Sequence, residues 1–582
     1  MARINNFILR FLPWLQTILS VVWLNNLAHT DAYFLIYAIL TILSFYLNIV
    51  CVSKSDNGKH KSISVIFSVV FSICVVLANY PIFIKVRDLE LIGRSTNLMV
   101  NLINTGLTGI GGVAVSYPVF HWWFSRRQSS ADGLIFKNKK IIAAAFSLIV
   151  IVNLVHLFLV EYPGNLTQDT FTQISEMLSG TYSNFNTFWH TIFFQGVLSA
   201  GYFIFHDVNA AAAFFCCFQI FVMAFAFTYC LVTMDRFGCH KAYVLVFFLI
   251  YSLVPYNMAL MITIWKDVLF AAGCLLMVTS LLRIMRYGSS VSVWDYLIFI
   301  FGSLLFLISR TNGWVIYLVF FLLNIVVNRK NCKLLAIIGF LAAFGWFLQN
   351  PALSVLHVSG GDPVESLSVP VQQVSRVIAD GCDISQEDQE LLSKVVDLDE
   401  VPTLYTSWLS DPMKVELRSK DYGYFLDHFE EYRSLWIRLG LKYPWEYVKA
   451  WVDQTKGYWN AGYDYALYSE TITDNPYGIE KTVSGNPVAS LFRLYFGLSR
   501  HVVFFEPLHS IGLHVWITIL CLAYHVMNKR SDWIISAPVL LLVLGLWFGT
   551  PVYACFRYVY PLFVCFPLIL STVFFHLKHN EQ

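Results

Sequence analysis

Three basic residues stand at the borders of apolar segments, where a positive charge can hold a phosphate group. Lys266, Arg310 and Arg557 lie in the stretches ITIWKDVLF, ISRTNGWVIY and PVYACFRYVYP. The guanidinium group of arginine presents a planar fork of donors that suits phosphate oxygens, and Tyr558 lies beside Arg557. Lys266 can bind a phosphate while the neighbouring Asp267 holds it in place. The alternative is that these charges only anchor the chain at the membrane interface, as charged residues near span ends often do.

A loop of opposite character lies between two apolar segments. The stretch EYPGNLTQDTFTQISEMLSGTYSNFN, residues 161–186, contains three acids and no lysine or arginine. A helix to about Leu178 places Asp169, Gln173 and Glu176 along one side, because they are spaced i, i+4 and i+7. This geometry suits a helix that lies on the membrane surface with Asp169 at its start. Asp is also a preferred N-cap residue, so a purely structural role for Asp169 stays open.

The longest polar region of the chain contains two further groups of interest. In ESLSVPVQQVSRVIADG, a helical register places Gln372, Gln373 and Arg376 off the apolar stripe, either as a binding group or as a solvated face. Residues 454–468 combine aromatic rings with Asn and Asp, a composition that suits sugar faces and also suits the membrane interface. His190, just after the acidic loop, is a candidate ligand or base, although a single His at the start of a span is more often structural.

The composition indicates which solvent the chain needs. Of the 582 residues, 57% are hydrophobic and 13% are charged, whereas soluble proteins usually carry about 25% charged residues. Many apolar runs reach the roughly 20 residues that cross a bilayer as a helix. The net charge of +2 provides no basic surface for nucleic acid. The cysteines form no CxxC pair and no disulfide framework, which predicts buried thiols. We therefore expect an all-α polytopic membrane protein.

The order of apolar segments predicts how the chain crosses the membrane. Candidate spans are 8–27, 32–52, 63–84, 99–121, 140–160, 187–205, 209–233, 243–262, 267–286, 294–309, 313–328, 334–349, 510–527, 533–550 and 558–577. Lysine and arginine clusters in short loops set the orientation, because such loops stay in the cytoplasm. The alternation fits if one of 187–205 and 209–233 does not fully cross, which gives about fourteen crossings with both termini inside. In this orientation the outer side of the membrane holds the loop with Asp169, the residues Lys266, Arg310 and Arg557, and the polar block 351–506.

In their order along the chain, these motifs resemble the GT-C class of membrane glycosyltransferases, which take sugars from polyprenyl-phosphate carriers. The resemblance rests on YPGNLTQDT with Asp169, NTFWHT with His190, IWKD, SRTNG with Asn312, and FRYVYP. The pattern YPG…D…Q…G…YSN…H and the stretch ESLSVPVQQVSRV look like an uncharacterised bacterial group within that class. The likeness covers roughly residues 140–577, and its order of motifs is more specific than any single one of them.

Two positions depart from the pattern of the class. Many members have a pair of acids in the first outer loop and His-Pro at the next span, whereas here Thr170 follows Asp169 and Thr191 follows His190. These departures leave metal use and the subfamily open. The resemblance divides the chain into a four-span N-terminal module (1–135), a GT-C-like catalytic transmembrane core (136–350), an extracytoplasmic helical domain (351–506) and C-terminal transmembrane helices (507–582).

The resemblance implies an inverting glycosyltransferase that moves a sugar from a polyprenyl-phosphate donor to a glycan, lipid or protein acceptor. Asp169 would act as general base on the acceptor hydroxyl. Lys266, Arg310 and Arg557 would bind the donor phosphate and offset the charge that develops on it. The supporting or acceptor-side residues would be His190, Asp267, Asn312, Gln372, Gln373, Arg376 and Tyr558. The lipid-linked sugar is the expected donor, a divalent metal stays open as a cofactor, and the expected location is the bacterial plasma membrane, with the endoplasmic reticulum as the alternative.

Two other functions compete with this interpretation. A polysaccharide polymerase or ligase also joins lipid-linked sugars outside the membrane, and it would depend on Arg and His more than on Asp169. A transporter would carry broken helices and ionisable residues deep within its spans. The candidate charges of this chain collect at one membrane surface instead, so a transporter is the weakest of the three hypotheses.

Overall fold

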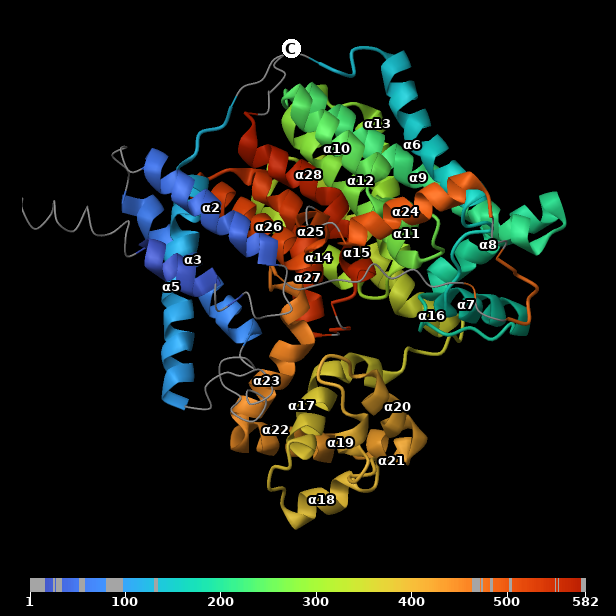
Figure 1. Ribbon diagram of the computed structural model, residues 1–582. Helices are drawn as coiled ribbons and strands as arrows, with labels where there is room; N and C mark the ends of the chain where they lie inside the picture. Colours follow the sequence, from blue (N-terminus) through green and yellow to red (C-terminus); the bar gives the residue numbers. More distant parts are fainter. Residues whose placement is uncertain are drawn as a thin grey trace, which may run out of the picture.

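The chain folds into helices throughout the part that the structure describes. This computed structural model describes residues 16–24, 27, 34–51, 58–79, 98–129, 134–462, 472, 475–481, 485–501, 505–549, 551–552 and 554–576. Within these ranges only isolated β-bridges occur, and no strand forms. Figure 1 shows a large helical bundle with a smaller helical domain below it. The all-α prediction is therefore confirmed for the described residues.

The bundle contains the long apolar helices. It consists of α2 (Phe34–Cys51), α3 (Gly58–Ala78), α5 (Leu98–Ser125), α6 (Lys139–Leu159), α8 (Phe188–Phe205), α9 (Val208–Arg236), α10 (Lys241–Leu253), α11 (Pro255–Met261), α12 (Lys266–Tyr287), α13 (Val293–Ser309), α14 (Gly313–Val327), α15 (Cys332–Gln349), α24 (Pro487–His501), α25 (Glu506–His509), α26 (Ile511–Met527), α27 (Ala537–Phe548) and α28 (Tyr560–Phe574), with the 3-10 turns η2 (Gly288–Ser290), η4 (Lys456–Tyr458), η6 (Ser531–Ser536) and η7 (Phe556–Val559). Two shorter helices, α7 (Gln168–Ser179) and α16 (Pro351–Val355), lie at the end of the bundle that faces the domain.

Eight of the described helices are long and apolar enough to cross a membrane, or nine if the bent pair α10–α11 counts as one span. Each predicted segment from 32–52 onward coincides with a described helix or helix pair, and residues 8–15 of the first segment lie outside the described residues. Several of these helices, α13, α14 and α26 among them, are shorter than the span criterion requires. The protein is thus a multi-pass membrane protein, while the count of fourteen crossings stays a prediction.

The helix α12 forms the centre of the bundle. Almost all of its residues are buried, and it packs against α9, α13 and α28. A Cβ added at Gly273 would lie 2.6 Å from the carbonyl oxygen of Gly302 on α13, so these two backbones touch directly. Small residues allow such close approach between membrane helices. This packing fixes the first residue of α12, Lys266, at one end of the bundle.

Contacts of α9 show where its two ends lie relative to α6. Asn209 at the start of α9 donates to the carbonyl oxygen of Gly478, and Lys481 of the same segment pairs with Glu161 just after α6. Asp235 near the end of α9 accepts hydrogen bonds from two backbone N–H groups just before α6. The start of α9 therefore lies beside the end of α6, and α7 joins α6 to α8 at that same end. Both α8 and α9 are long and apolar enough to cross a membrane, so which of them fully crosses stays a prediction.

The smaller domain has its own apolar core, separate from that of the bundle. Its elements are η3 (Pro363–Leu367), α17 (Ser368–Ala379), α18 (Gln386–Leu392), α19 (Val401–Leu404), α20 (Asp411–Ser419), α21 (Tyr422–Asp427), α22 (Phe429–Lys442) and α23 (Pro444–Thr455). The dipeptide Tyr443-Pro444 separates α22 from α23, since the residue before a proline is disfavoured in a helix. Past α23, Tyr458 and Trp459 pack into the bundle core, and α24 packs on α6, so the part of the polar block that folds as a separate core is smaller than 351–506.

Candidate functional site

A cavity of about 610 Å³ lies between the bundle and the helical domain. This volume falls within the range of roughly 300–1,000 Å³ that is typical of ligand pockets. The bundle contributes the polar lining residues Asp169, Asn186, Lys266, Arg310, Arg557 and Tyr558, and the domain contributes Asp362, Glu365, Asp411, Lys414 and Arg418. Four side chains from distant parts of the chain, Asp169 and the three predicted phosphate-binding residues, therefore lie at one cavity.

Asp169 points into this cavity from the first turn of α7. The N-cap residue of α7 is Thr167, whose backbone N–H donates to Thr170 Oγ1 at 3.2 Å, so Asp169 is not the cap. The carboxylate of Asp169 instead accepts a hydrogen bond from Arg557 Nη1 at 2.9 Å. Its position near a helix N-terminus also favours a negative charge.

The charges around Asp169 keep it ionised at neutral pH. Partial burial acts to raise the pKa of Asp169, but the positive charges of Lys266 and Arg557 outweigh this effect and hold the pKa below its usual value. The hydrogen bond from Arg557 acts in the same direction. Asp169 is therefore a carboxylate with free acceptor capacity on the cavity wall, as a proton acceptor requires.

Lys266 and Asp267 do not pair with each other, contrary to the sequence prediction. Lys266 Nζ donates to Asn186 Oδ1 at 3.2 Å, and both residues line the cavity. Asp267 accepts a hydrogen bond from Arg310 Nη1 at 2.9 Å, and both side chains are almost fully buried. Neighbouring residues in a helix point in different directions, about 100° apart, which separates the lysine from the aspartate.

Tyr558 lies between the two arginines. Its ring is 4.8 Å from the guanidinium carbon of Arg310 and 4.7 Å from that of Arg557. The Tyr558 hydroxyl also accepts a hydrogen bond from Arg557 Nη2 at 2.8 Å, and the same guanidinium lies 4.8 Å from the ring of Trp265. Such cation–π contacts hold an arginine in one orientation. The bundle side of the cavity thus has three fixed cations against the two carboxylates Asp169 and Asp267.

Two of the supporting residues lie close to this cavity without lining it. His190 is fully buried, and its Nδ1 lies 3.0 Å from Gln173 Nε2, while its Nε2 has no hydrogen-bond partner among the described residues. Asn312 directly follows the cavity-lining Thr311 in the tight turn between α13 and α14. The dipeptide Asn312-Gly313, a common turn signal in sequences, thus marks the turn between these two helices.

Three other candidate residues lie inside the helical domain instead. Gln372 Nε2 donates to the carbonyl oxygen of Thr406 at 2.7 Å, and Gln373 Oε1 accepts from Trp436 Nε1 at 2.8 Å. Arg376 is buried and pairs with Asp453 at 2.7 Å and with Glu446 and Asp380 at 3.3 Å. None of the three lines the cavity, so their acceptor-side role stays a prediction that the geometry does not favour.

The domain contributes five charged residues that the sequence patterns did not point to, Asp362, Glu365, Asp411, Lys414 and Arg418. Lys414 pairs with Glu365 at 2.8 Å, and Arg418 pairs with Asp362 at 2.6 Å and also with Glu365. The hydroxyl of Tyr422 donates to Asp362. Burial acts to raise the pKa of Asp362 and of Glu365, but these partners lower both below their usual values. The i, i+4 spacing of Lys414 and Arg418 could have placed both on one side of a helix, but not at this cavity.

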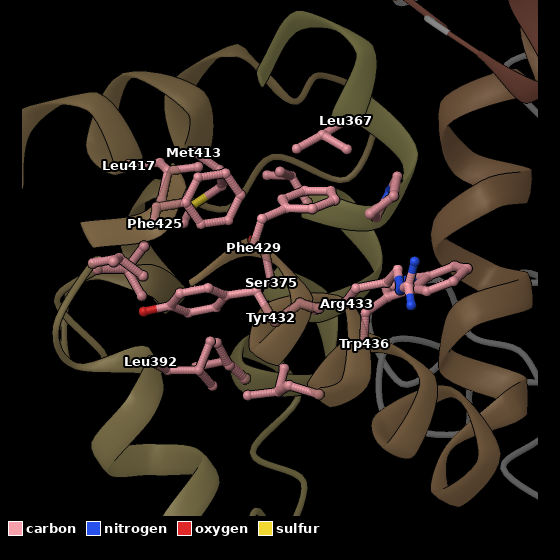
Figure 2. A pocket seen from close by; sticks show the side chains of 17 residues that line it. Leu367, Ser375, Leu392, Met413, Leu417, Phe425, Phe429, Tyr432, Arg433 and Trp436 are labelled. Atoms are coloured by element: carbon pink, nitrogen blue, oxygen red, sulfur yellow. The ribbon is translucent and has the colours of Figure 1, made fainter. Parts of the chain in front are cut away.

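The helix α20 separates this charged cavity from an apolar one. Met413 and Leu417, on the other side of α20 from Lys414 and Arg418, line a cavity of about 200 Å³ inside the domain. Figure 2 shows that its walls are mainly aliphatic and aromatic side chains, with Arg433 at the edge. This second cavity contains no group of charges, so the charged cavity is the candidate site.

The residues at the charged cavity do not form a recognisable metal site. Within the described ranges, no three His, Cys, Asp or Glu side chains gather as metal ligands would. The acids at the cavity are each engaged by a cation instead. Metal dependence therefore stays as open as the sequence left it.

These features define an all-helical, multi-pass membrane protein with a charged cavity between its bundle and a helical domain. Comparison with known families places the chain more narrowly. The chain belongs to a family of unknown function, DUF6020, whose model matches residues 178–582. The match includes Lys266, Arg310, Arg557 and the whole helical domain, and it begins after Asp169. No curated protein and no solved structure matches the chain.

Proposed function

We propose that the chain is an inverting glycosyltransferase of the GT-C type that uses a polyprenyl-phosphate sugar as donor. The observation that supports this most is the meeting of Asp169 with Lys266, Arg310 and Arg557 at one cavity. A carboxylate supplies a proton acceptor, and the cations supply a site for a leaving phosphate. The general base and the phosphate-binding site need opposite charges near one reacting carbon. Both kinds of charge lie on the wall of this cavity.

The proposed reaction is a single displacement at the anomeric carbon of the sugar. The oxygen of the acceptor hydroxyl forms a bond to that carbon, and its proton passes to Asp169. The bond from the carbon to the phosphate oxygen breaks, and the electron pair leaves with the polyprenyl phosphate. Lys266, Arg310 and Arg557 offset the negative charge that this oxygen acquires. The carboxylates Asp362 and Glu365 on the domain side are suited to accept hydrogen bonds from acceptor hydroxyls.

The positive-inside pattern supports a position of this cavity on the outer side of the membrane. The polyprenyl chain of the donor would stay in the bilayer while its phosphate reaches the cavity at the membrane surface. The bacterial plasma membrane is the proposed location, and the proposed acceptor is a glycan, lipid or protein of the cell envelope.

Release of polyprenyl phosphate tests this proposal without knowledge of the sugar. Purified protein would be incubated with a panel of monosaccharide-phosphate decaprenols and a membrane extract that supplies acceptors, and free decaprenyl phosphate would be quantified. The wild type should release it from at least one donor. Asp169→Asn should not, and Asp207→Asn should match the wild type, because Asp207 caps α9 outside the cavity by accepting from the Ala210 N–H. Equal release by Asp169→Asn and wild type would remove Asp169 from the mechanism.

A second candidate is a polymerase or ligase that uses oligosaccharides linked through a diphosphate. It is favoured by Lys414 and Arg418, which add two cations to the cavity and could hold the second phosphate. An oligosaccharide-diphosphate decaprenol separates the two candidates when the same assay quantifies free decaprenyl diphosphate, the leaving group of that donor. Release from that lipid alone would favour the polymerase or ligase, and release from a monosaccharide-phosphate lipid alone would favour the first proposal.

A further inference from the structure

A third cavity, which is polar and has a volume of about 680 Å³, lies at the opposite end of α12 from the candidate site. It is formed by the turn between α12 and α13, where Ser289 and Val291 lie, and by the turn between α14 and α15. The 22 residues of α12 span about 33 Å at about 1.5 Å per residue, which is close to the thickness of a bilayer core. This cavity and the candidate site are therefore about one membrane thickness apart. In the predicted orientation, this cavity faces the cytoplasm.

Three cations at this cavity have no acidic partner. Arg329, Lys330 and Lys333 line it, and within the described ranges none of them forms an ion pair. Lys333 only contacts the ring of Tyr296, with its Nζ 4.1 Å from the ring centroid. All three side chains are exposed. Because these three positive charges have no carboxylate partner among the described residues, the cavity should attract an anion.

Two acids near this end of the bundle, Asp295 and Asp532, are already occupied by other arginines. Asp295 pairs with Arg283 at 2.6 Å. Asp532 pairs with Arg286 at 2.6 Å and with Arg530 at 2.8 Å. Each of these arginines therefore has a carboxylate partner within the protein, whereas the cations of the α14–α15 turn have none among the described residues. This contrast indicates that the α14–α15 turn binds an anion that is not part of the chain.

The surroundings of the cavity indicate an amphiphilic ligand. Its inner wall is apolar and includes Ile284, Val291 and Val327. Beside its mouth, exposed apolar side chains continue along the helices toward the membrane interior: Val293 and Trp294 are 67% and 71% exposed, and Val326 is 72% exposed. A soluble anion would gain nothing from these surfaces, while acyl chains would cover them. Basic pockets between helices on the cytoplasmic side of membrane proteins bind anionic lipid headgroups in this way.

We infer that this cavity binds the headgroup of an anionic phospholipid from the cytoplasmic leaflet. Arg329, Lys330 and Lys333 contact the phosphate and the headgroup, and the acyl chains lie along the apolar faces of α13 and α14. The lipid would connect the α12–α13 turn to the α14–α15 turn and so stabilise the end of the bundle that lies across the membrane from the candidate site. This inference does not depend on the proposed transferase activity.

Native mass spectrometry of the full chain, released from a neutral detergent, tests the inference. The probes are palmitoyl-oleoyl phosphatidylglycerol, palmitoyl-oleoyl phosphatidylcholine and inorganic phosphate. The tightest phosphatidylglycerol should bind at least about tenfold more strongly than phosphatidylcholine, because each basic residue near an anionic headgroup contributes about fivefold. Replacing Arg329, Lys330 and Lys333 together by Gln should remove this preference. Inorganic phosphate should bind more weakly than phosphatidylglycerol, and equal affinity would assign the site to a soluble anion and overturn the inference.

A matched control separates the cavity from simple positive charge. Replacement by Gln of Lys137, Lys139 and Lys140 removes three exposed cations from the end of the loop before α6 and from the first turn of α6. That loop lies at the same end of the bundle, because Arg283 of α12 donates to Thr233 near the end of α9 at 3.4 Å. The control should change phosphatidylglycerol affinity by less than about twofold if the cavity is the site. An equal loss in both triple variants would overturn the inference.

A third variant keeps the charges and removes the space. Ser289 is exposed at the rim of the cavity, so Ser289→Trp can fill it without disturbing the bundle core. This variant should also lose the preference for phosphatidylglycerol, and it keeps the test decisive if the triple variant does not fold. Unchanged phosphatidylglycerol binding by Ser289→Trp would overturn the cavity as the binding site.

Discussion

Replacing Asp169 by Asn separates the proposed base from a structural anchor. The substitution keeps the shape of the side chain and leaves an amide oxygen that can still accept from Arg557, which donates to Asp169 at 2.9 Å in the wild type. It removes one negative charge from a cavity wall that has three cations, Lys266, Arg310 and Arg557, against two carboxylates. The variant therefore changes the chemistry of the position more than its packing.

The expected losses differ strongly between turnover and stability. Loss of a general base usually slows a reaction by roughly 10²–10⁴-fold, which corresponds to about 2.7–5.4 kcal/mol at about 1.36 kcal/mol per tenfold. The side chains of Asp169 and Arg557 are 27% and 19% exposed, so solvent screens their ion pair. We expect the free energy of unfolding to fall by only about 1 kcal/mol, between the values for exposed and buried pairs.

The affinity for a phosphate should move in the opposite direction to turnover. With Asp169 neutral, the excess of positive charge on the bundle side rises by one. Farnesyl phosphate, a soluble stand-in for the leaving group, should therefore bind to Asp169→Asn as tightly as to the wild type or more tightly. An interaction made only in the transition state affects turnover without weakening ground-state binding.

The assay combines decaprenyl phosphate release, farnesyl phosphate binding by calorimetry, and thermal unfolding. Asp207→Asn is the matched control, since Asn is also a good N-cap residue and should leave all three measurements unchanged. The reasoning is refuted if Asp169→Asn retains wild-type turnover. It is refuted as well if farnesyl phosphate binding falls together with turnover, because Asp169 would then serve only to position the cations.

Three further predictions test other parts of the structure. Arg557→Gln removes one cause of the low pKa of Asp169, so the acid limb of decaprenyl phosphate release should move to higher pH in a pH–rate profile. An unmoved limb would contradict the proposed role. Gly302→Val should cost about 1–3 kcal/mol in thermal unfolding, because an added Cβ would lie 2.8 Å from the backbone of α12, while Gly196→Ala, with no atom within 4 Å, should cost nothing. Arg376→Met removes the ion pairs with Asp453, Glu446 and Asp380, which keep only their contacts with Lys456 or Lys449, and should destabilise the protein by about 1.5–3 kcal/mol. Farnesyl phosphate affinity should stay within about twofold of the wild type because Arg376 does not line the cavity.

The sequence predicted the helices well because local patterns determine them. Apolar runs of span length mark the bundle helices, and Tyr443-Pro444 marks the break between α22 and α23, since the residue before a proline is disfavoured in a helix. The turn at Asn312-Gly313 follows from the same kind of local signal. The number of membrane crossings did not follow from these patterns, because helix length and composition do not say whether a helix such as α8 passes through the bundle or returns.

The candidate site was predictable only for the residues that topology alone brings together. Asp169, Lys266, Arg310 and Arg557 all lie at span borders on the same predicted side of the membrane, so the alternation of loops suggested that they meet. Side-chain partners within the site required the structure. The pairing of Arg310 with Asp267, for example, depends on the close contact of α12 and α13, which the sequence does not reveal.

The domain side of the cavity shows the limit of sequence patterns most clearly. Lys414 and Arg418 belong to a short helix with a mixed surface, and nothing local distinguishes them from a solvated face. Conversely, Gln372, Gln373 and Arg376 looked like a binding group, but they connect α17 to α23 and its neighbours. Which side of a domain faces a cavity depends on how that domain docks, and this is a property of the whole fold.

The contact between Asp169 and Arg557 implies an order of events under the proposed mechanism. While Arg557 donates to Asp169, its charge keeps the carboxylate a weak base. A donor phosphate in the cavity would share the charge of Arg557 and of Lys266, which would raise the pKa of Asp169 and strengthen it as a proton acceptor. The base would thus become effective only when the leaving phosphate is already in place. Such coupling would protect the lipid-linked sugar, because an acceptor hydroxyl would be activated only beside a correctly bound donor.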